Sequence, residues 1–116
     1  MSYIGNLKIK ASGSEYVFKV YKIDEFKYIE DENVIYAFLK TSPSLSGYSS
    51  KILYVGRTTQ EFSDRAKYHH KWKKALSMGF NTIGICPVDG RSIKRIEKEI
   101  IRAKNPPCND IKYQEE

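Results

Sequence analysis

Apolar residues recur along this chain in two patterns that predict five β-strands. The first two runs alternate apolar and polar residues, as half-buried strands do, whereas the later runs are mostly apolar, as buried strands are. Residues 12–14, Ser-Gly-Ser, separate the first two runs and predict a β-hairpin. Residues 43–50 have the composition of a loop, and the two strands that they join should pair antiparallel. The predicted strands span residues 7–11, 15–23, 34–41, 51–58 and 81–88.

Two segments have the period of a helix. The first runs from Gln60 to Met78, and the second runs to about Lys104, with Ser92 as its predicted N-cap. Prolines directly after residue 105 stop the second helix, because proline cannot continue it. The element order predicts an α+β fold: a small, mainly antiparallel sheet flanked by helices, with an extra N-terminal β-hairpin.

The length of 116 residues fits a single domain. We expect residues 1–32, which hold the hairpin and an acidic connector, to pack on a main domain formed by residues 33–116. No run of about 18 apolar residues is present, so we expect no membrane span. The N-terminus lacks the apolar segment of a signal peptide, which favours the cytoplasm. In that compartment Cys86 and Cys108, which lack metal-ligand spacing, should be free thiols.

The net charge of +6 is unevenly distributed. Residues 1–33 hold five lysines and six acids, a net charge of −1, whereas residues 34–114 carry fifteen Lys and Arg and six acids, a net charge of +9. A basic body of this size suits a polyanion such as nucleic acid. The alternative is a solvated basic surface that keeps the protein soluble.

Glu97 lies on the apolar stripe of the second predicted helix. On a helical projection it falls between Ile100 and Ile101, whereas Arg95, Lys98 and Arg102 fall on the opposite side. A carboxylate in such a place must be paired, reach water at the edge of the stripe, or coordinate an ion. Glu97 is therefore a salt-bridge partner of a nearby arginine, a carboxylate that reaches water at the edge of the stripe, or a ligand for Mg²⁺, which favours one or two carboxylates.

The first predicted helix also carries polar groups on an apolar face. Arg65, His69, Trp72 and Leu76 are spaced i, i+4, i+7 and i+11, so a continuous helix would place them on one side. Arg65 and His69 would then lie one turn apart. They are either solvated groups at the edge of an amphipathic helix or parts of a site.

Two tyrosines interrupt the apolar strands, Tyr36 in VIYAF and Tyr54 in ILYVG. A buried phenol needs a hydrogen-bond partner, so each ring is either core and cross-strand packing or part of a site. Gly56 would let a phosphate or another backbone segment approach closely, and Arg57 follows it at the end of the strand.

The order of these residues resembles the GIY-YIG nuclease family. Val34-Ile35-Tyr36 corresponds to the first half of the family motif and Tyr54-Val55-Gly56 to the second. The resemblance covers residues 33–110, and the stretches NVIYA and NPPCN are similar to small phage members of the family. Valine replaces the first glycine of the motif, and the loop between the tyrosines is longer than usual. The remaining family residues follow in the family's order: Arg57, Arg65, His69, Glu97 and Asn109.

The resemblance implies a metal-dependent endonuclease that hydrolyses phosphodiester bonds of DNA, with RNA and a homo-oligomer left open. Glu97 would hold one Mg²⁺ or Mn²⁺. Tyr36 would be the general base, with its pKa lowered by adjacent cations or its proton relayed by His69. Tyr54 would position water or phosphate, and Asn109 would orient a catalytic group or the water shell of the metal. The implied catalytic residues are Tyr36, Tyr54, Arg57, Arg65, His69, Glu97 and Asn109, with Gly56 structural.

Contacts to the nucleic-acid backbone would be non-specific and made by basic side chains. Two alternatives remain: a nucleic-acid-binding module on the same fold that does not cut, and a small inhibitor protein that uses the N-terminal hairpin and the acidic connector. The basic residues expected at the backbone are Lys71, Lys73, Lys74, Lys94, Lys98 and Arg102.

Overall fold

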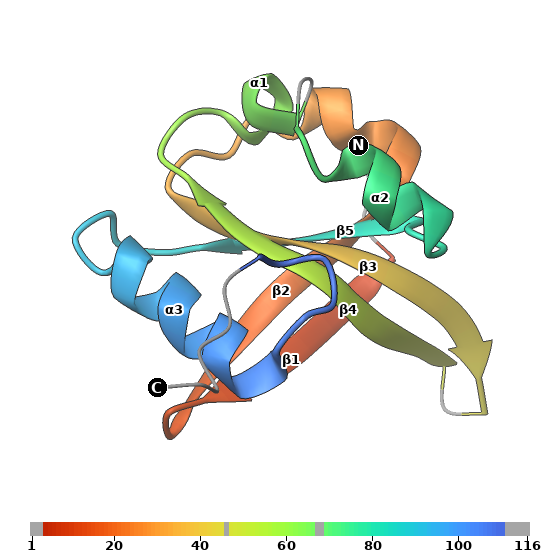
Figure 1. Cartoon of the computed structure of the whole chain (residues 1–116), viewed down its shortest axis with the longest axis horizontal. Coiled ribbons are helices and arrows are strands. Elements are labelled where there is room, and N and C mark those ends of the chain that lie inside the picture. The colour runs from red at the N-terminus through yellow and green to blue at the C-terminus, as the bar shows by residue number, and fades with distance from the viewer. Residues whose placement is uncertain (1–3, 46, 67–68, 111–116) are drawn as a thin grey trace.

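One antiparallel sheet organises the part of the chain that the structure describes, residues 4–45, 47–66 and 69–110. In this computed structural model five strands follow one another across the sheet in the order β1-β2-β5-β3-β4 (Figure 1). The small antiparallel α+β architecture predicted from the sequence is confirmed. The strands are β1 Gly5–Ala11, β2 Ser14–Lys22, β3 Val34–Ser44, β4 Gly47–Thr58 and β5 Thr82–Pro87.

The predicted N-terminal hairpin is formed by β1 and β2. Its turn residues Ser12 and Gly13 have φ angles of 51° and 79°, the left-handed conformation that two-residue hairpin turns require. β2 then pairs antiparallel with β5, where Lys19 lies opposite Ile85. The hairpin is therefore continuous with the sheet, and it supplies the β1 edge.

The predicted loop over residues 43–50 is wrong in most of its length. β3 and β4 pair from Val34 opposite Thr58 out to Ser44 opposite Gly47, so they form one long hairpin that extends beyond the other strands (Figure 1). Its outer half is exposed, and polar, serine-rich positions are suited to a ladder that faces water on both sides. The polar composition of residues 43–50 therefore reflects exposure to water, and it does not mean that a strand is absent.

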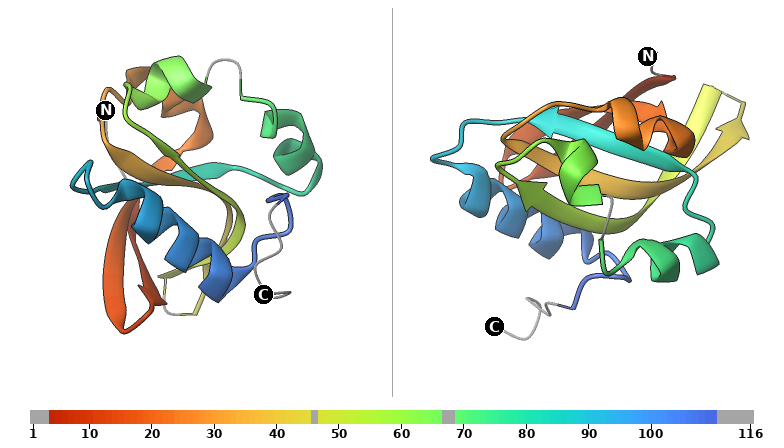
Figure 2. Two further views of the ribbon diagram at one scale, coloured as in Figure 1. Left: turned by 60° about the vertical axis from the view of Figure 1, so that its left-hand side comes forward. Right: turned by 90° about the horizontal axis from the view of Figure 1, so that it is seen from above.

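Helices cover both faces of the sheet (Figure 2). Along β3, Ile35, Ala37 and Leu39 face a core shared with α3, whereas Tyr36 and Phe38 face a second core beneath α1 and α2. Because both faces of β3 are buried, its sequence is continuously apolar. The helices are η1 Ile23–Tyr28, a 3₁₀ helix, and α1 Phe62–Ala66, α2 Trp72–Ser77 and α3 Ile93–Lys104.

The single helix predicted from Gln60 to Met78 is wrong. The chain forms two short helices, α1 and α2, and His69 lies between them with its backbone N–H bonded to the Ala66 carbonyl. The expected common face is broken, because Leu76 is exposed whereas His69 is buried. The interruption lets His69 and Trp72 each turn an aromatic ring onto Phe38 of β3, at centroid distances of 4.9 and 5.5 Å.

Helix α3 begins and ends close to the predicted positions. Its four isoleucines are buried, as the projection predicted. Ser92 occupies the N-cap position, as predicted, and its carbonyl accepts a hydrogen bond from the Ile96 N–H at 2.9 Å, but its side chain makes no capping hydrogen bond. Asn105 ends the helix in the left-handed conformation, with φ at 44°. Within the described residues, no helix is long and apolar enough to cross a bilayer.

Candidate active site

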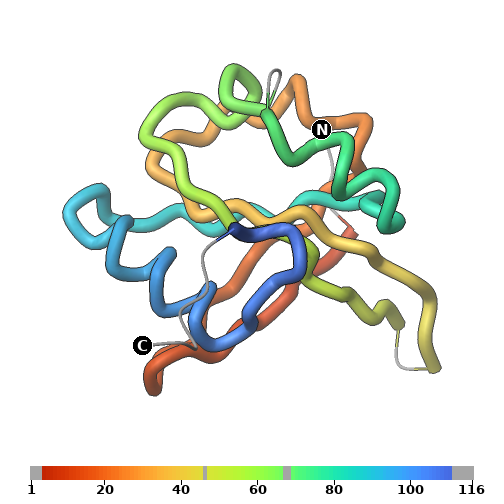
Figure 3. Tube along the Cα trace, in the orientation of Figure 1, coloured from red at the N-terminus to blue at the C-terminus, as the bar shows by residue number. Residues whose placement is uncertain are grey.

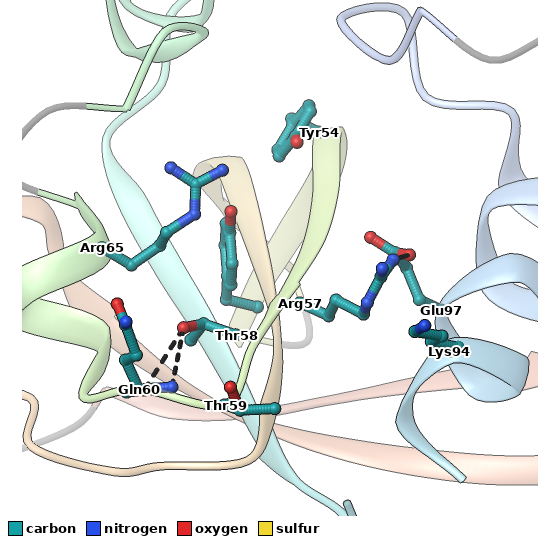
Figure 4. A pocket seen from close by; sticks show the side chains of 9 residues that line it. Tyr54, Arg57, Thr58, Thr59, Gln60, Arg65, Lys94 and Glu97 are labelled. Carbon is teal, nitrogen blue, oxygen red and sulfur yellow. Dashed lines mark hydrogen bonds and ion pairs between the residues drawn. The ribbon is translucent and has the colours of Figure 1, made fainter. Parts of the chain in front are cut away.

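A cleft of about 530 Å³ opens where the end of β4 and the loop after it face α1 and the first half of α3 (Figure 4). Figure 4 shows Arg65 on one side of the cleft and the side chains of Arg57 and Glu97 on the other. Five of the seven catalytic candidates thus share one cavity, although they come from four separate elements. The lining residues are Tyr36, Tyr54, Arg57, Thr58, Thr59, Gln60, Arg65, Lys94 and Glu97.

Glu97 is paired with Arg57, and this ion pair joins α3 to the end of β4. The Glu97 side chain is only 13% exposed and that of Arg57 is 40% exposed, so the carboxylate lies largely within the protein. The salt bridge to a nearby arginine, one of the three explanations for a glutamate on the isoleucine stripe, is confirmed. The pair places both signs of charge at the mouth of the cleft.

The donor set for a metal is small. Glu97 is the only carboxylate among the described residues that line the cleft. The described part of the chain has no group of three or more His, Cys, Asp or Glu side chains arranged to hold an ion. A single carboxylate still fits Mg²⁺, which keeps several waters and takes further oxygen ligands from substrate phosphates.

Tyr36 fills the inner wall of the cleft. Its ring is fully buried and packs edge-on against Phe62, with centroids 5.1 Å apart, and lies 6.2 Å from the ring of Tyr54. Burial raises the pKa of Tyr36 far above its ordinary value, and the neighbouring Tyr54 raises it further. Arg65 acts in the opposite direction and is outweighed. The prediction that adjacent cations would lower this pKa is therefore wrong for the free protein.

Tyr54 is partly buried beside Tyr36. Burial is the main cause that raises its pKa, and the negative charge of Glu97 adds to it. Both phenols are therefore neutral at physiological pH. They offer hydroxyl groups to the cleft and no anionic oxygen.

Gly56 makes room for Tyr36. It lies directly across the ladder from Tyr36, and a Cβ atom built on it would stand 2.5 Å from the Tyr36 hydroxyl oxygen and 2.9 Å from Cε2 of Tyr54. The expectation that Gly56 would admit a phosphate or another backbone is corrected, because the group that approaches is the phenol. The glycine thus determines where the Tyr36 hydroxyl lies.

His69 lies behind Tyr36 and does not line the cleft. It is buried, and its Nε2 atom is 2.8 Å from the Tyr36 hydroxyl oxygen. Its Nδ1 atom accepts a hydrogen bond from the backbone N–H of Lys71 at 3.0 Å. Burial, assisted by the charge of Arg65, lowers the pKa of His69 to about 4. The imidazole is therefore neutral at physiological pH.

Asn109 lies outside the cleft and binds the backbone of β4. Its Oδ1 accepts from the Val55 N–H at 3.0 Å, and its Nδ2 donates to the Val55 carbonyl at 2.9 Å. One residue earlier, the N–H of Cys108 donates to the Leu53 carbonyl, so the segment runs beside β4 (Figure 3). The predicted role in orienting a catalytic group or a water shell is corrected: Asn109 holds the strand that carries Tyr54 and Arg57.

The basic residues expected at nucleic acid occupy three places. Lys71 is 13% exposed and bonded to Asp110 at 2.7 Å, so its role as a free backbone contact is corrected. Lys73 and Lys74 are exposed on α2 and line neither the cleft nor the groove described next. Lys94 lines the cleft and also a groove of about 360 Å³ along α3, lined by Ser12, Lys94, Arg95, Lys98, Glu99 and Arg102.

Several lining residues were not predicted. Thr58, Thr59 and Gln60 follow Arg57 directly, and the Thr58 hydroxyl oxygen accepts a hydrogen bond from the Gln60 N–H at 3.1 Å. The only signal in the sequence is that these three residues are polar and directly follow the strand that carries Tyr54 and Arg57. Arg95, which the helical projection places opposite the apolar stripe, lines the groove.

Comparison with known proteins identified no matching family model, no matching curated protein and no matching solved structure. The class that the described residues define is a small α+β domain with one antiparallel sheet and a basic cleft at the end of β4.

Proposed function

We propose that this protein is a metal-dependent endonuclease of the GIY-YIG type that hydrolyses phosphodiester bonds in DNA. The observation that carries the proposal is the meeting of Tyr36, Tyr54, Arg57, Arg65 and Glu97 in one cleft. These residues lie up to 61 positions apart in the sequence, and all five belong to the catalytic set that the family resemblance implies.

The charges of the cleft suit a phosphodiester. Arg57, Arg65 and Lys94 supply three cationic side chains, against the single carboxylate of Glu97. Guanidinium groups match the geometry of phosphate oxygens and form charge-assisted hydrogen bonds with them. Phosphodiester hydrolysis increases the negative charge on these oxygens in the transition state, so cations placed there accelerate the reaction. Thus Arg65 would bind the phosphate from one side of the cleft and Arg57 from the other.

Glu97 is the residue that would hold a divalent metal ion. When bound, such an ion would act as a Lewis acid on a phosphate oxygen and would neutralise part of the charge that develops. Arg57 occupies the Glu97 carboxylate in the free protein. With Glu97 holding an ion, Arg57 would be available to the substrate phosphate, because a guanidinium and a metal ion compete for one carboxylate.

The groove along α3 would carry the DNA backbone beyond the cleft. Lys94, Lys98 and Arg102 are spaced i, i+4 and i+8, so they follow one another along one side of the helix, and Lys94 lines both hollows. Such contacts read no sequence and release counterions, so binding would weaken steeply with salt.

Cleavage of a supercoiled plasmid in Mg²⁺ tests the proposal. Glu97→Gln is the informative variant. Asp24→Asn is the control, because Asp24 is exposed on η1 and lines neither the cleft nor the groove along α3. We expect Glu97→Gln and the wild type in EDTA to lose about 100-fold or more in rate, with Asp24→Asn close to the wild type. A folded wild type that leaves DNA and RNA intact, or cleavage that survives Glu97→Gln, would refute the mechanism.

The Arg57–Glu97 pair favours one second candidate, a nucleic-acid-binding module that does not cut, because the pair occupies the carboxylate that catalysis would use. Salt-dependent DNA binding by fluorescence anisotropy, without cleavage in Mg²⁺ or Mn²⁺, would support this candidate. A stoichiometric complex with another protein, in the absence of DNA binding, would instead support an inhibitor.

A further inference from the structure

The two ring nitrogens of His69 have different partners, and one of these partners fixes the position of the proton. Nδ1 lies 3.0 Å from the backbone nitrogen of Lys71, and a backbone N–H can only donate. Nδ1 must therefore be the unprotonated acceptor. The neutral ring then carries its proton on Nε2, which is 2.8 Å from the Tyr36 hydroxyl oxygen, so His69 donates this hydrogen bond and Tyr36 accepts it.

The surroundings of His69 hold the ring in this state. It is packed edge-on against the rings of Tyr36, Tyr54 and Phe38, at centroid distances of 4.9 to 5.7 Å, so rotation of the imidazole would disturb the core. Protonation of Nδ1 would place two N–H donors against each other. The titratable and charged groups that face the ring within the described residues are two phenols and three basic side chains: Tyr36, Tyr54, Arg65, His70 and Lys71.

The position of the Tyr36 oxygen is equally restricted. The phenol lies over Gly56, where there is no Cβ atom, and its ring is wedged against Phe62. With one side of the oxygen occupied by the Nε2–H of His69, the phenolic proton is directed away from His69. Its remaining surroundings are Tyr54 and the cleft.

We propose that His69 is a positioning residue that makes Tyr36 a hydrogen-bond donor to an anionic phosphate oxygen in the cleft, and that Tyr36 is not the proton acceptor of the hydrolysis. The identity of the substrate rests on the proposed function, whereas the direction of the His69–Tyr36 hydrogen bond does not. A neutral phenol held in the buried wall of a cleft is a strong donor to developing negative charge. It is a poor base, because burial favours its protonated form.

The hydrogen-bond direction can be measured in the free protein by ¹H–¹⁵N NMR of the histidine imidazoles. We expect His69 to show a protonated Nε2 and an unprotonated Nδ1, and to remain neutral between pH 8 and about 5. A proton on Nδ1, or an imidazolium at neutral pH, would overturn the proposal whether or not the protein cuts DNA.

Two substitutions at His69 separate donation from acceptance. The side chain of His69→Gln can still donate to the Tyr36 oxygen, whereas the carboxylate of His69→Glu can only accept and would take the phenolic proton for itself. We expect His69→Gln to keep the cleavage rate within about threefold and His69→Glu to lose about 10- to 100-fold, the size of one hydrogen bond to a charged group. If Tyr36 were the base, a carboxylate that accepts its proton would assist it at least as well as glutamine does. A cleavage rate of His69→Glu equal to or above that of His69→Gln would therefore refute the proposal.

Fluorination of Tyr36 gives a readout that does not depend on the stability of these variants. Replacing Tyr36 by 3-fluorotyrosine lowers the pKa of the phenol. A base would show a rising limb in the pH profile of kcat/KM that moves to lower pH, and this limb would refute the proposal. A donor shows no such limb. If the wild type does not cut, titration with inorganic phosphate replaces the rate: the proposal predicts weaker binding by His69→Glu than by His69→Gln, and equal binding refutes it.

Discussion

Replacing Gly56 by alanine should destabilise the protein through a clash with Tyr36. The new methyl group would stand 2.5 Å from the Tyr36 hydroxyl oxygen, 2.6 Å from Cζ and 2.9 Å from Cε2 of Tyr54. Carbon atoms in contact are normally separated by about 3.5 Å or more. The phenol cannot move aside freely, because its ring is fully buried against Phe62 and its oxygen is bonded to His69.

The expected loss is that of an overpacked core. Forcing an extra methyl group into a close-packed interior destabilises by about 1–3 kcal/mol. For a chain of this length, 1 kcal/mol corresponds to a shift in Tm of roughly 3–6 °C, so Gly56→Ala should lower the Tm by about 5–15 °C. Adding Tyr36→Phe removes the shortest of the three contacts and leaves the other two, so the double variant should recover part of the loss caused by Gly56→Ala.

Thermal and urea unfolding of Gly56→Ala, followed by circular dichroism, measure this loss. Gly5→Ala is the matched control, because Gly5 also lies in a strand and a Cβ atom there would meet nothing within 4 Å. Equal stability of Gly56→Ala and Gly5→Ala would refute the argument that Gly56 exists to accommodate the phenol. A cleavage rate that Gly56→Ala leaves unchanged would separately refute the dependence of the site on the Tyr36 position.

Three further predictions concern single interactions. Asn109→Ala removes both hydrogen bonds to Val55, so we expect a loss of about 1–3 kcal/mol and faster hydrogen exchange of the Val55 amide; unchanged exchange would contradict this. Because the pKa of His69 is lowered from 6.5 to about 4, the unfolded chain binds more protons there between these pH values, so the free energy of unfolding should rise with pH across this window, by about 1–3 kcal/mol. His69→Gln should flatten this rise, and an equal slope in both proteins would contradict the assignment. Replacing Lys98 and Arg102 by alanine should weaken DNA binding and reduce the slope of log K against log salt concentration by about 2. An unchanged slope would contradict DNA binding in the groove along α3.

Burial on both faces of the sheet is what made the strands predictable. β3 and β5 carry continuous apolar runs because helices cover both sides of them, and this pattern is visible without coordinates. The outer half of the β3–β4 hairpin is polar, since water surrounds it, and its composition therefore predicts a loop where the chain forms strands. The break between α1 and α2 was also not predictable from the sequence. Arg65, His69 and Trp72 have the spacing of a continuous helix, although the chain forms two helices there.

The sequence predicts which residues meet in the site, but it does not predict what each of them does there. The order of tyrosines, arginines and glutamate indicated which side chains should meet, and five of them line the cleft. The partner of each group was not visible in the sequence. The binding of Asn109 to the β4 backbone and the ion pair of Lys71 with Asp110 depend on where the segment after α3 returns. Such long-range contacts have no local signal.

The segment after α3 also covers part of the outer edge of β4. β4 ends the sheet, and the outer edge of such a strand offers free N–H and C=O groups on which another chain can form a new strand. Cys108 and Asn109 occupy these groups at Leu53 and Val55, with a side-chain amide standing in for a neighbouring backbone. A chain shortened after Asn105 would expose this edge next to its most apolar stretch, and it should aggregate at concentrations at which the full chain remains monodisperse.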